Sequence, residues 1–204
     1  MTDTKTLWDK AWNECAEGID LAGARVGGRA TKENPNKEDQ EWWNKSGPKW
    51  LSEYISWRTN NPEWKLWTLP TGEPAVEFGL TPIIGDAVVK MFIDRVFEVN
   101  GELVIVDLKT SRNLPASSLQ LGFYKVGIEM TYGVQINTGN YYMSRNSGTG
   151  GMIDLSVYTY DKIEYIVNKF NQARHAGLFL PNNNNCNTLC GLTQHCNFYT
   201  PKIG

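Results

Sequence analysis

The sequence predicts an α/β fold in which helices pack against a mixed central sheet. Two runs rich in β-forming residues, 88–99 and 102–108, are joined by Asn100-Gly101, a dipeptide typical of two-residue hairpin turns. Apolar residues recur at helical spacing before this hairpin and after it. The resulting order of helix, strands, helix, two strands and helix favours a single mixed sheet covered by helices.

The N-terminal part is expected to be helical. A first helix covers residues 4–17 and stops at Gly18, and a polar, basic, glycine-rich loop follows at residues 23–37. A second helix covers residues 48–58 and begins at Pro48, because the first turn of a helix tolerates proline. Aromatic residues at helical spacing on this second helix predict packing, although such rings also stack on unpaired bases; they are Trp50, Tyr54 and Trp57.

Strands and helices alternate through the rest of the chain. Two or three strands occupy residues 75–108, a helix covers 115–132, short strands follow at 138–145 and 153–158, and a last helix covers 161–176. The residues expected to point inward from these two helices are Leu119, Phe123, Val126 and Met130, and Ile163, Ile166, Val167 and Phe170.

A length of 204 residues suits one domain with its own core. We expect a helical N-terminal part, residues 1–60, a core, residues 74–176, and a cysteine-rich tail, residues 177–204, that packs with the first helix. No apolar run is long enough to cross a bilayer and the start resembles no secretory signal, so we expect a cytoplasmic protein.

The formal net charge of −2 does not favour nucleic acid as a partner, because a molecule of that charge lacks a long-range attraction for phosphates. Metal-dependent enzymes need only local positive charge. The residues that could supply it are Arg25, Arg29, Lys32, Lys37, Lys109, Arg112 and Lys125.

Asp94 and Asp107 are the first candidates for chemistry. A two-residue turn pairs Val99 with Glu102, and counting back along the ladder places Asp94 opposite Asp107, with Lys109 on the same face. Directly opposed like charges destabilise a sheet, and a divalent cation offsets them. The sequence therefore predicts a Mg²⁺ or Mn²⁺ site, where the Lys109 ammonium could assist a hydroxide or neutralise a phosphate.

The alternative is a solvated strand face with scattered charges. Apolar neighbours expected on the face of the two carboxylates, Phe92, Val96 and Ile105, favour a site. A bulge in either strand would shift the register by one residue and separate the carboxylates.

Four cysteines could form a second metal centre. Cys186, Cys190 and Cys196 fall within eleven residues, and Cys15 lies near the other end of the chain. Disulfides are not expected in a cytoplasmic protein. An uneven split of three and one suits an iron-sulfur cluster better than zinc, whose ligands come as close pairs. Zinc and unligated thiols stay open, and His195 could replace one thiolate.

Taken together, the motifs GDAVVKMFIDR, IVDLKTS and QLGFY and the C-terminal cysteines resemble the iron-sulfur members of the RecB-like branch of the PD-(D/E)XK nuclease superfamily. These members include CRISPR-associated RecB-like exonucleases and the nuclease domain of the AddB helicase-nuclease. The resemblance covers almost the whole chain. It implies a restriction-endonuclease-like core and a 4Fe-4S cluster that joins the N- and C-terminal segments through the four cysteines.

By this resemblance Asp94 matches the first metal-binding aspartate of the family. Asp107 and Lys109 match its D-x-K pair, and Gln120 and Tyr124 match its Q-x-x-x-Y helix. The family cuts DNA with Mg²⁺ or Mn²⁺, and the Q-x-x-x-Y residues contact substrate or orient the catalytic groups. The alternative for Gln120 and Tyr124 is plain helix packing.

Two features depart from the family pattern. The cysteine spacing is C-x3-C-x5-C, whereas two residues more often separate the first pair. Members also tend to carry a histidine on the helix before the strands, and residues 48–58 contain none. Either Glu53 on that helix or Glu77 on the first strand could be a further metal ligand instead, or both are solvated carboxylates.

We therefore expect a metal-dependent deoxyribonuclease, an exonuclease acting on single-stranded DNA ends. Asp94, Asp107 and the Leu108 main-chain carbonyl would hold one or two Mg²⁺ or Mn²⁺ ions. The alternatives are a non-catalytic DNA-binding or adaptor module that keeps the fold and the cluster, and a zinc-stabilised hydrolase of another phosphoester. Besides DNA, the expected partners are proteins of recombination or CRISPR adaptation. The sequence does not define the oligomeric state or the direction of digestion.

Overall fold

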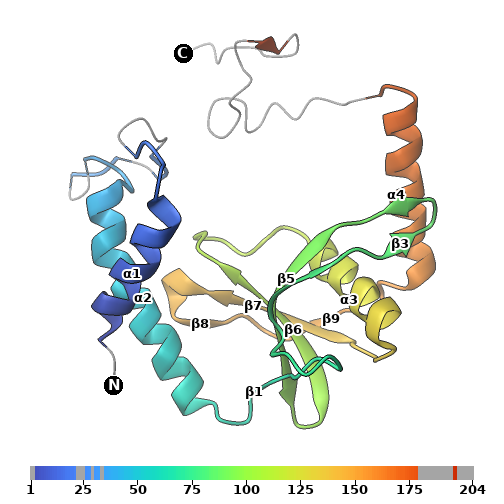
Figure 1. Cartoon of the computed structure of the whole chain (residues 1–204), viewed down its shortest axis with the longest axis horizontal. Coiled ribbons are helices and arrows are strands. Elements are labelled where there is room, and N and C mark those ends of the chain that lie inside the picture. Colours follow the sequence, from blue (N-terminus) through green and yellow to red (C-terminus); the bar gives the residue numbers. More distant parts are fainter. Residues whose placement is uncertain (1–2, 22–25, 29, 33–34, 179–194, 197–204) are drawn as a thin grey trace.

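A central sheet with helices on both faces forms the fold in the computed structural model (Figure 1). The structure describes residues 3–21, 26–28, 30–32, 35–178 and 195–196. The helices are α1 (Thr4–Ala16), α2 (Gln40–Asn60), α3 (Leu119–Tyr132) and α4 (Tyr160–His175), with a short 3₁₀ helix η1 (Ser144–Asn146). The strands are β1 (Lys65–Leu66), β2 (Val76–Leu80), β3 (Ile83–Ile84), β4 (Ala87–Val88), β5 (Met91–Val99), β6 (Glu102–Lys109), β7 (Thr138–Met143), β8 (Gly148–Thr149) and β9 (Ile153–Asp154).

The long strands β5 and β6 lie at the centre of a sheet of seven strands. They pair antiparallel, whereas β6 and β7 pair in parallel through the α3 crossover. Strands β1 and β2 share the outer edge of β5, and β8 and β9 share the outer edge of β7. Strands β3 and β4 form a separate small hairpin. The expected mixed α/β sheet flanked by helices is confirmed.

The turn between β5 and β6 has the conformation that its sequence favours. Asn100 has a φ of 52° and Gly101 a φ of 85°, and two consecutive positive φ values define a type I′ turn. The ladder begins with Val99 opposite Glu102 and continues in register for five residue pairs. This register is the one that the sequence predicts.

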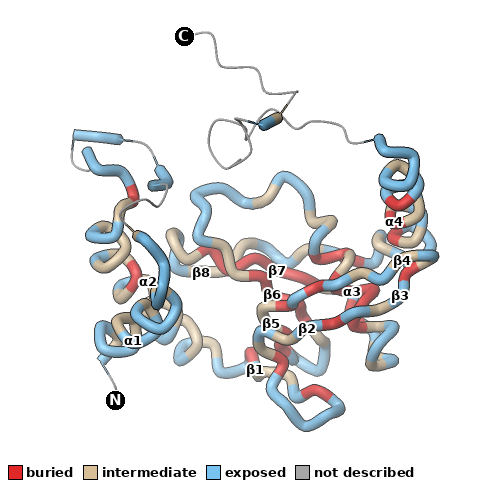
Figure 2. The backbone as a smooth tube through the Cα atoms, turned by 45° about the horizontal axis from the view of Figure 1, so that its top comes forward, coloured by how far each residue is buried: buried red, intermediate tan, exposed pale blue. Residues whose placement is uncertain are grey.

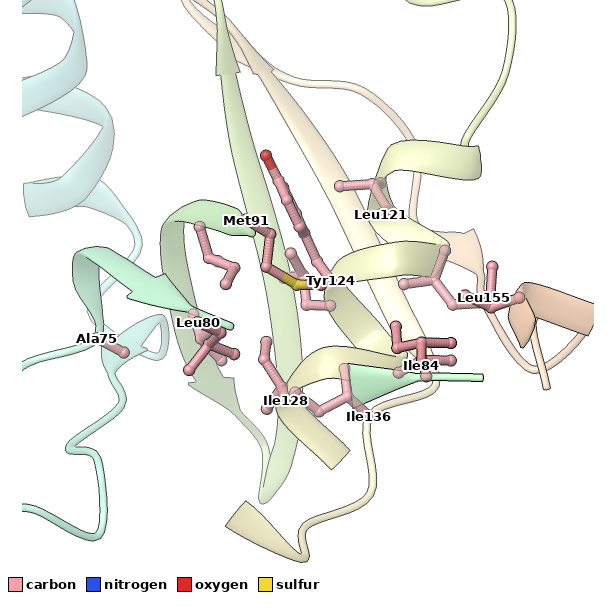
Figure 3. Close-up of a cluster of buried hydrophobic side chains, with 14 of the residues drawn as sticks. Ala75, Leu80, Ile84, Met91, Leu121, Tyr124, Ile128, Ile136 and Leu155 are labelled. Carbon is pink, nitrogen blue, oxygen red and sulfur yellow. The ribbon is translucent and has the colours of Figure 1, made fainter. Parts of the chain in front are cut away.

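Two buried clusters lie on opposite faces of the sheet, and Figure 2 shows how burial concentrates in the central strands. The larger cluster joins the sheet to α3, and Figure 3 shows Leu121, Tyr124 and Ile128 of that helix among its members. The smaller cluster includes Phe97 and Tyr142 of the sheet and packs against α2. Helix α2 therefore covers one face, while α3 and α4 lie on the other (Figure 1).

Helix α2 is longer than expected. It begins at Gln40, eight residues before the predicted start at Pro48, which lies inside the helix. Asp39 caps it, since its carboxylate accepts a hydrogen bond of 2.9 Å from the Trp42 backbone N–H. Nearer its C-terminus, Tyr54 and Trp57 contact the ring of Tyr142, with centroids 5.0 and 5.2 Å away, so the predicted aromatic packing is confirmed for these two residues. Trp50 packs instead against Trp42 and Trp43 of the same helix.

The inward residues of α3 and α4 differ in part from the expectation. Met130 is 43% exposed and Phe170 is 78% exposed, so neither points into the core. Helix α3 instead buries a face that includes two glycines, Gly122 and Gly127. A Cβ on Gly122 would lie 2.5 Å from Tyr158 Cγ. Glycines carry no apolar signal, so hydrophobic periodicity cannot detect a face that depends on their small size.

Two expectations outside the core have different outcomes. No helix among the described residues combines the length and the apolarity that a bilayer crossing requires. The expected packing of the tail with α1 falls mainly on residues 179–194 and 197–204, outside the described part of the chain, and stays a prediction.

Replacing Gly122 by alanine tests the close approach of α3 to Tyr158. We expect Gly122→Ala to lower the free energy of unfolding by about 1–3 kcal/mol, because the added methyl group overpacks the contact. Urea unfolding measures the change. In Gly151→Ala, where nothing lies within 4 Å of the new Cβ, we expect a change within about 0.5 kcal/mol. Stabilisation by Gly122→Ala, the usual effect of alanine in a helix, would contradict the contact.

Candidate active site

Asp94 and Asp107 come together on adjacent central strands. The β5–β6 ladder ends with Arg95 opposite Val106, and Asp94 and Asp107 are the next residues on their strands, close enough for the charge of Asp94 to raise the pKa of Asp107. Asp94 Oδ2 accepts a hydrogen bond of 2.7 Å from the Leu108 backbone N–H, so its side chain reaches across to β6. Asp107 is 2% exposed. The two carboxylates thus lie at one point of the sheet, as the hairpin register predicts.

Lys109 connects Asp107 to helix α3. Its Nζ lies 2.6 Å from Asp107 Oδ2 and donates a hydrogen bond of 3.1 Å to Gln120 Oε1. Gln120 Nε2 in turn donates to Tyr124 Oη at 2.7 Å. Four of the predicted site residues therefore form one continuous polar network, and Tyr124 sits on the buried face of α3 rather than at its border.

The electrostatics of this network favour a bound cation. Burial raises the pKa of Asp107, the hydrogen bond and the charge of Lys109 lower it, and the charge of Asp94 raises it again, with a net shift upward. Burial is also the main reason that the pKa of Tyr124 is raised, and the charges of Asp107, Asp94 and Glu77 add to that shift. Negative charge thus gathers at this point of the sheet.

Asp107 Oδ2 shows that the residues present fit a divalent metal ion. The atom is buried, and its one partner is the Lys109 ammonium, 2.6 Å away. Lys109 offsets the burial of this carboxylate only in part, because the net shift in the pKa of Asp107 is still upward, and a further cation would stabilise its charged form. No three His, Cys, Asp or Glu side chains converge among the described residues, and Mg²⁺ is commonly bound by one or two carboxylates plus substrate oxygens.

Glu77, not Glu53, lies on the side of the two aspartates. In the β2–β5 ladder Glu77 lies between the residues paired with Arg95 and Ile93, the two neighbours of Asp94, and its charge acts on Tyr124. Glu53 instead acts on Tyr142, whose pKa is raised mainly by burial and further by the charge of Glu53, and which belongs to the cluster that packs against α2. The sequence does not decide which of these two glutamates could be a further metal ligand. In the fold they act on tyrosines of different buried clusters, and only Glu77 lies near the aspartates.

The backbone is irregular where the carboxylates meet. Glu77 has a φ of 48° in the middle of a strand, a left-handed conformation that glutamate rarely adopts. Ile93 and Val96 both belong to the larger core cluster, although residues three apart in a regular strand point to opposite faces. The alternation of β5 is therefore interrupted beside Asp94. Such irregularities are typical of strands that re-aim a side chain next to a functional site.

Not all the cations expected near the site are available. Lys125 is 6% exposed and forms an ion pair of 2.6 Å with Glu129, so the expectation that it supplies surface charge is wrong. Arg112 is largely exposed, with one guanidinium nitrogen 3.7 Å from Glu38. Lys32 and Lys37 are exposed, and Arg25 and Arg29 lie outside the described residues.

Tyr141 is a site residue that the sequence analysis misses. It is paired with Asp107 in the β6–β7 ladder, and its ring centroid lies 5.9 Å from Lys109 Nζ. Its hydroxyl donates to the Ser117 carbonyl at 3.3 Å, which ties the segment before α3 to the sheet. Burial and the charge of Asp107 raise the pKa of Tyr141 to about 12, so it stays a neutral phenol.

Arg145 is the second residue that the sequence analysis misses. Its Nε donates to the Thr110 carbonyl, directly after Lys109, at 2.5 Å. Its NH2 group lies 2.8 Å from Glu38 Oε2, and its guanidinium lies 5.1 Å from the ring centroids of both Trp42 and Trp50. Arg145 therefore connects the residue after β6 to helix α2 and to Glu38 just before it. No local motif marks this role, because its partners are distant in sequence.

The cysteine cluster is only partly within the described residues. Cys15 is exposed on α1, and Cys196 is half-buried. Cys186 and Cys190 lie outside the described residues, so the predicted four-cysteine centre stays a prediction.

A model of the PD-(D/E)XK nuclease superfamily matches residues 2–198, which is nearly the whole chain. The chain belongs to this superfamily. That membership confirms the coarser resemblance, while its iron-sulfur branch stays a prediction. Within the superfamily motif, Asp107 and Lys109 are the residues expected to form the D-x-K pair, and they are the two that form the closest ion pair of the site.

Two phage proteins are similar to this PD-(D/E)XK chain. The Gene 69 protein of Mycobacterium phage D29 is 30% identical over 191 residues, covering 83% of this chain and 69% of that protein. The Gene 69 protein of Mycobacterium phage L5 is 28% identical over 210 residues, covering 83% and 70%. A crystal structure from Eubacterium rectale that carries the name of an exonuclease aligns with a TM-score of 0.47 and 15% identity, covering 100% of this chain and 78% of that one. That likeness is too weak to add to the assignment.

The raised pKa of Asp107 predicts how the metal-free protein responds to pH. Asp107 binds its proton more tightly in the folded state than in the unfolded state. As the pH rises from the ordinary pKa of 3.8 through the raised pKa of the folded state, the folded protein therefore loses stability, and above the raised pKa the loss is complete. We expect Asp107→Asn to raise Tm in EDTA at pH 7 by about 2–4 °C, because a gain of about 1 kcal/mol in the free energy of unfolding shifts Tm by that amount in a chain of this size. Differential scanning fluorimetry measures the change.

The pH series and a matched variant complete this test. Lowering the pH should shrink the difference between wild type and Asp107→Asn as the wild-type carboxyl takes up its proton. Glu102→Gln, at the exposed start of the same strand, should leave Tm nearly unchanged. A lower Tm for Asp107→Asn than for wild type in EDTA at pH 7 is the outcome that this account does not allow.

Proposed function

We propose that this protein is a metal-dependent deoxyribonuclease that digests single-stranded DNA from its ends. The observation that carries the proposal is the network of Asp107, Lys109, Gln120 and Tyr124, with Asp94 across the hairpin, in a chain of a nuclease superfamily. Opposed carboxylates, an adjacent ammonium and a polar helix face are the groups that phosphodiester hydrolysis requires.

Asp94, Asp107 and the Leu108 carbonyl would hold the metal ion. The Leu108 N–H points toward Asp94, and the N–H and C=O groups of one strand residue point to the same side, which supports the carbonyl as a ligand. Glu77 is the nearer of the two candidate glutamates, although within the described residues it does not converge with the two aspartates into a three-carboxylate group. When bound, Mg²⁺ or Mn²⁺ activates water and neutralises charge on the phosphate.

Lys109 would stabilise charge that develops during hydrolysis. Asp107 and Gln120 hold its ammonium between them, and the ring of Tyr141 lies behind it, so little reorganisation is needed when a phosphate arrives. Gln120 is held in turn by the Tyr124 hydroxyl. In this proposal Gln120 and Tyr124 are positioning residues for Lys109, and Gln120, which is exposed, also contacts the DNA.

A non-catalytic DNA-binding or adaptor module is the second candidate. The net charge of −2 and the absence of histidine from helix α2 favour it. The two candidates differ in what they do to a labelled strand, because a binder retards the strand in a gel whereas an enzyme shortens it.

Asp107→Ala and Lys109→Ala test the site assignment. We expect each to reduce cleavage of single-stranded DNA with Mn²⁺ at least about 100-fold, because removal of one charge-stabilising group typically costs that much. Oligonucleotides labelled at either end and resolved on a denaturing gel measure the rate and show whether digestion starts from an end. Glu102→Gln should cut at the wild-type rate. Wild-type cutting by purified Asp107→Ala would remove these carboxylates from the mechanism.

For the cysteines, we propose a 4Fe-4S cluster that joins α1 to the tail through Cys15, Cys186, Cys190 and Cys196. Four thiolates with this uneven spacing support the proposal. Linking residues that are so far apart in sequence would restrict the unfolded chain strongly, so the role proposed for the cluster is to stabilise the fold.

Cys190→Ala separates this stabilising centre from the catalytic one. After anaerobic purification we expect wild type to absorb in the visible range and to contain iron, and Cys190→Ala to lose the colour and several degrees of Tm. Asp107→Ala should keep the colour. Zinc in place of iron by elemental analysis, or colour unchanged in Cys190→Ala, would contradict the cluster without touching the nuclease proposal.

A further inference from the structure

Phe92 is unusually exposed for an aromatic residue on a central strand. It lies on β5 two residues before Asp94, and 56% of its surface is accessible. On the neighbouring strand β2 its partner is Gly79, where a Cβ would come within 3.2 Å of the Phe92 ring. The ring thus lies over a position without a side chain. Within the described part of the chain, it stacks on no other ring.

The exposed ring lines a pocket that opens beside the candidate active site. The pocket has a volume of about 410 Å³, and Phe92 shares its wall with Phe123, Gln120 and Tyr124 of α3. Gln120 is the residue that accepts a hydrogen bond from Lys109. A group bound against Phe92 would therefore lie next to the network that faces the scissile phosphate.

Positive charge borders the same pocket. Lys90 lines it, with Nζ 5.1 Å from the centroid of the Phe92 ring. The pocket thus combines an exposed ring with an ammonium over it, a second aromatic wall, and an amide able to donate and accept hydrogen bonds. These are the features of surfaces that stack a base and hold its phosphate.

We propose that this pocket binds an unpaired nucleobase of the DNA strand, stacked on Phe92, with the adjoining phosphate near Lys90. The inference rests on the proposed function, and it names the reason for a single-strand preference. A base in a duplex is paired and stacked on its neighbours, so it cannot enter the pocket. The base of a frayed or single-stranded end is free to enter.

A double-mutant cycle tests the contact between ring and base. Wild type and Phe92→Ala, each carrying Asp107→Asn so that the strand stays intact, are titrated into a fluorescent single-stranded oligonucleotide and followed by anisotropy. Matched oligonucleotides carry one abasic nucleotide at each of the terminal positions in turn. Stacking on an aromatic side chain typically changes binding affinity about 5- to 150-fold. In wild type we therefore expect a missing base at one of these positions to weaken binding of the oligonucleotide roughly tenfold.

The expected result is coupling between the variant and the abasic position. Phe92→Ala should bind intact DNA about tenfold more weakly and lose nothing further at the abasic position, and Phe92→Trp should restore both. Phe170→Ala, which removes an even more exposed ring on α4 outside this pocket, should keep the full loss of affinity at the abasic position. The base pocket is wrong if Phe92→Ala loses as much affinity as wild type does at every abasic position. It is also wrong if Phe92→Ala binds intact DNA with wild-type affinity.

This result is separable from the outcome for the proposed nuclease. If wild type cuts DNA with Mn²⁺ but the cycle shows no coupling, the base pocket is wrong and the nuclease stands. If the cycle shows coupling but wild type leaves the strand intact, the pocket stands and the second candidate, a DNA-binding module, replaces the enzyme.

Discussion

A turn of two residues determines where Asp94 and Asp107 meet. Asn100 and Gly101 adopt the type I′ conformation, and the pairing that follows has a single register. A slip by one residue would turn every side chain of one strand to the other face, and the aspartates would separate. Lys109 follows on the same strand, the α3 crossover brings Gln120 over it, and the parallel strand β7 supplies Tyr141 from behind. The site is therefore a consequence of the register.

With this register, a carboxylate whose charged form is destabilised by burial lies inside the fold. Asp107 is nearly inaccessible, its pKa is raised by burial, and Lys109 offsets this effect only in part. The backbone is irregular at the same point, at Glu77 and beside Asp94. Proteins keep such features where function depends on them, because elsewhere substitution would remove them. A shared divalent cation would relieve the repulsion, and a phosphodiester would complete its coordination.

The parts of this fold that depend on neighbouring residues could be predicted from the sequence. The hairpin register follows from Asn100-Gly101, and the start of α1 and the end of α4 follow from local signals. Pro48 is a strong local signal for a first turn and predicts a start there, but α2 begins at Gln40 behind its Asp39 cap and contains this proline. The buried face of α3 differs from the expected one because glycines form part of it.

The parts that depend on distant residues could not be predicted. Arg145 joins Thr110, Glu38 and two tryptophans of α2, and no spacing in the sequence links these positions. The exposure of Phe92 depends in the same way on Gly79 of another strand. Motifs identify the residues proposed to carry the chemistry of the site, whereas the residues that hold them in place become visible only once the sheet is assembled.

In the proposed site Asp94 and Asp107 share one divalent cation. Anomalous diffraction from crystals grown with Mn²⁺ can locate that ion, because manganese scatters anomalously and no protein atom gives a comparable signal. We expect a peak within coordination distance of oxygens from both carboxylates, absent from crystals of Asp107→Asn. Manganese bound only to other acidic residues, with these two carboxylates turned away from each other, would rule out the shared ion.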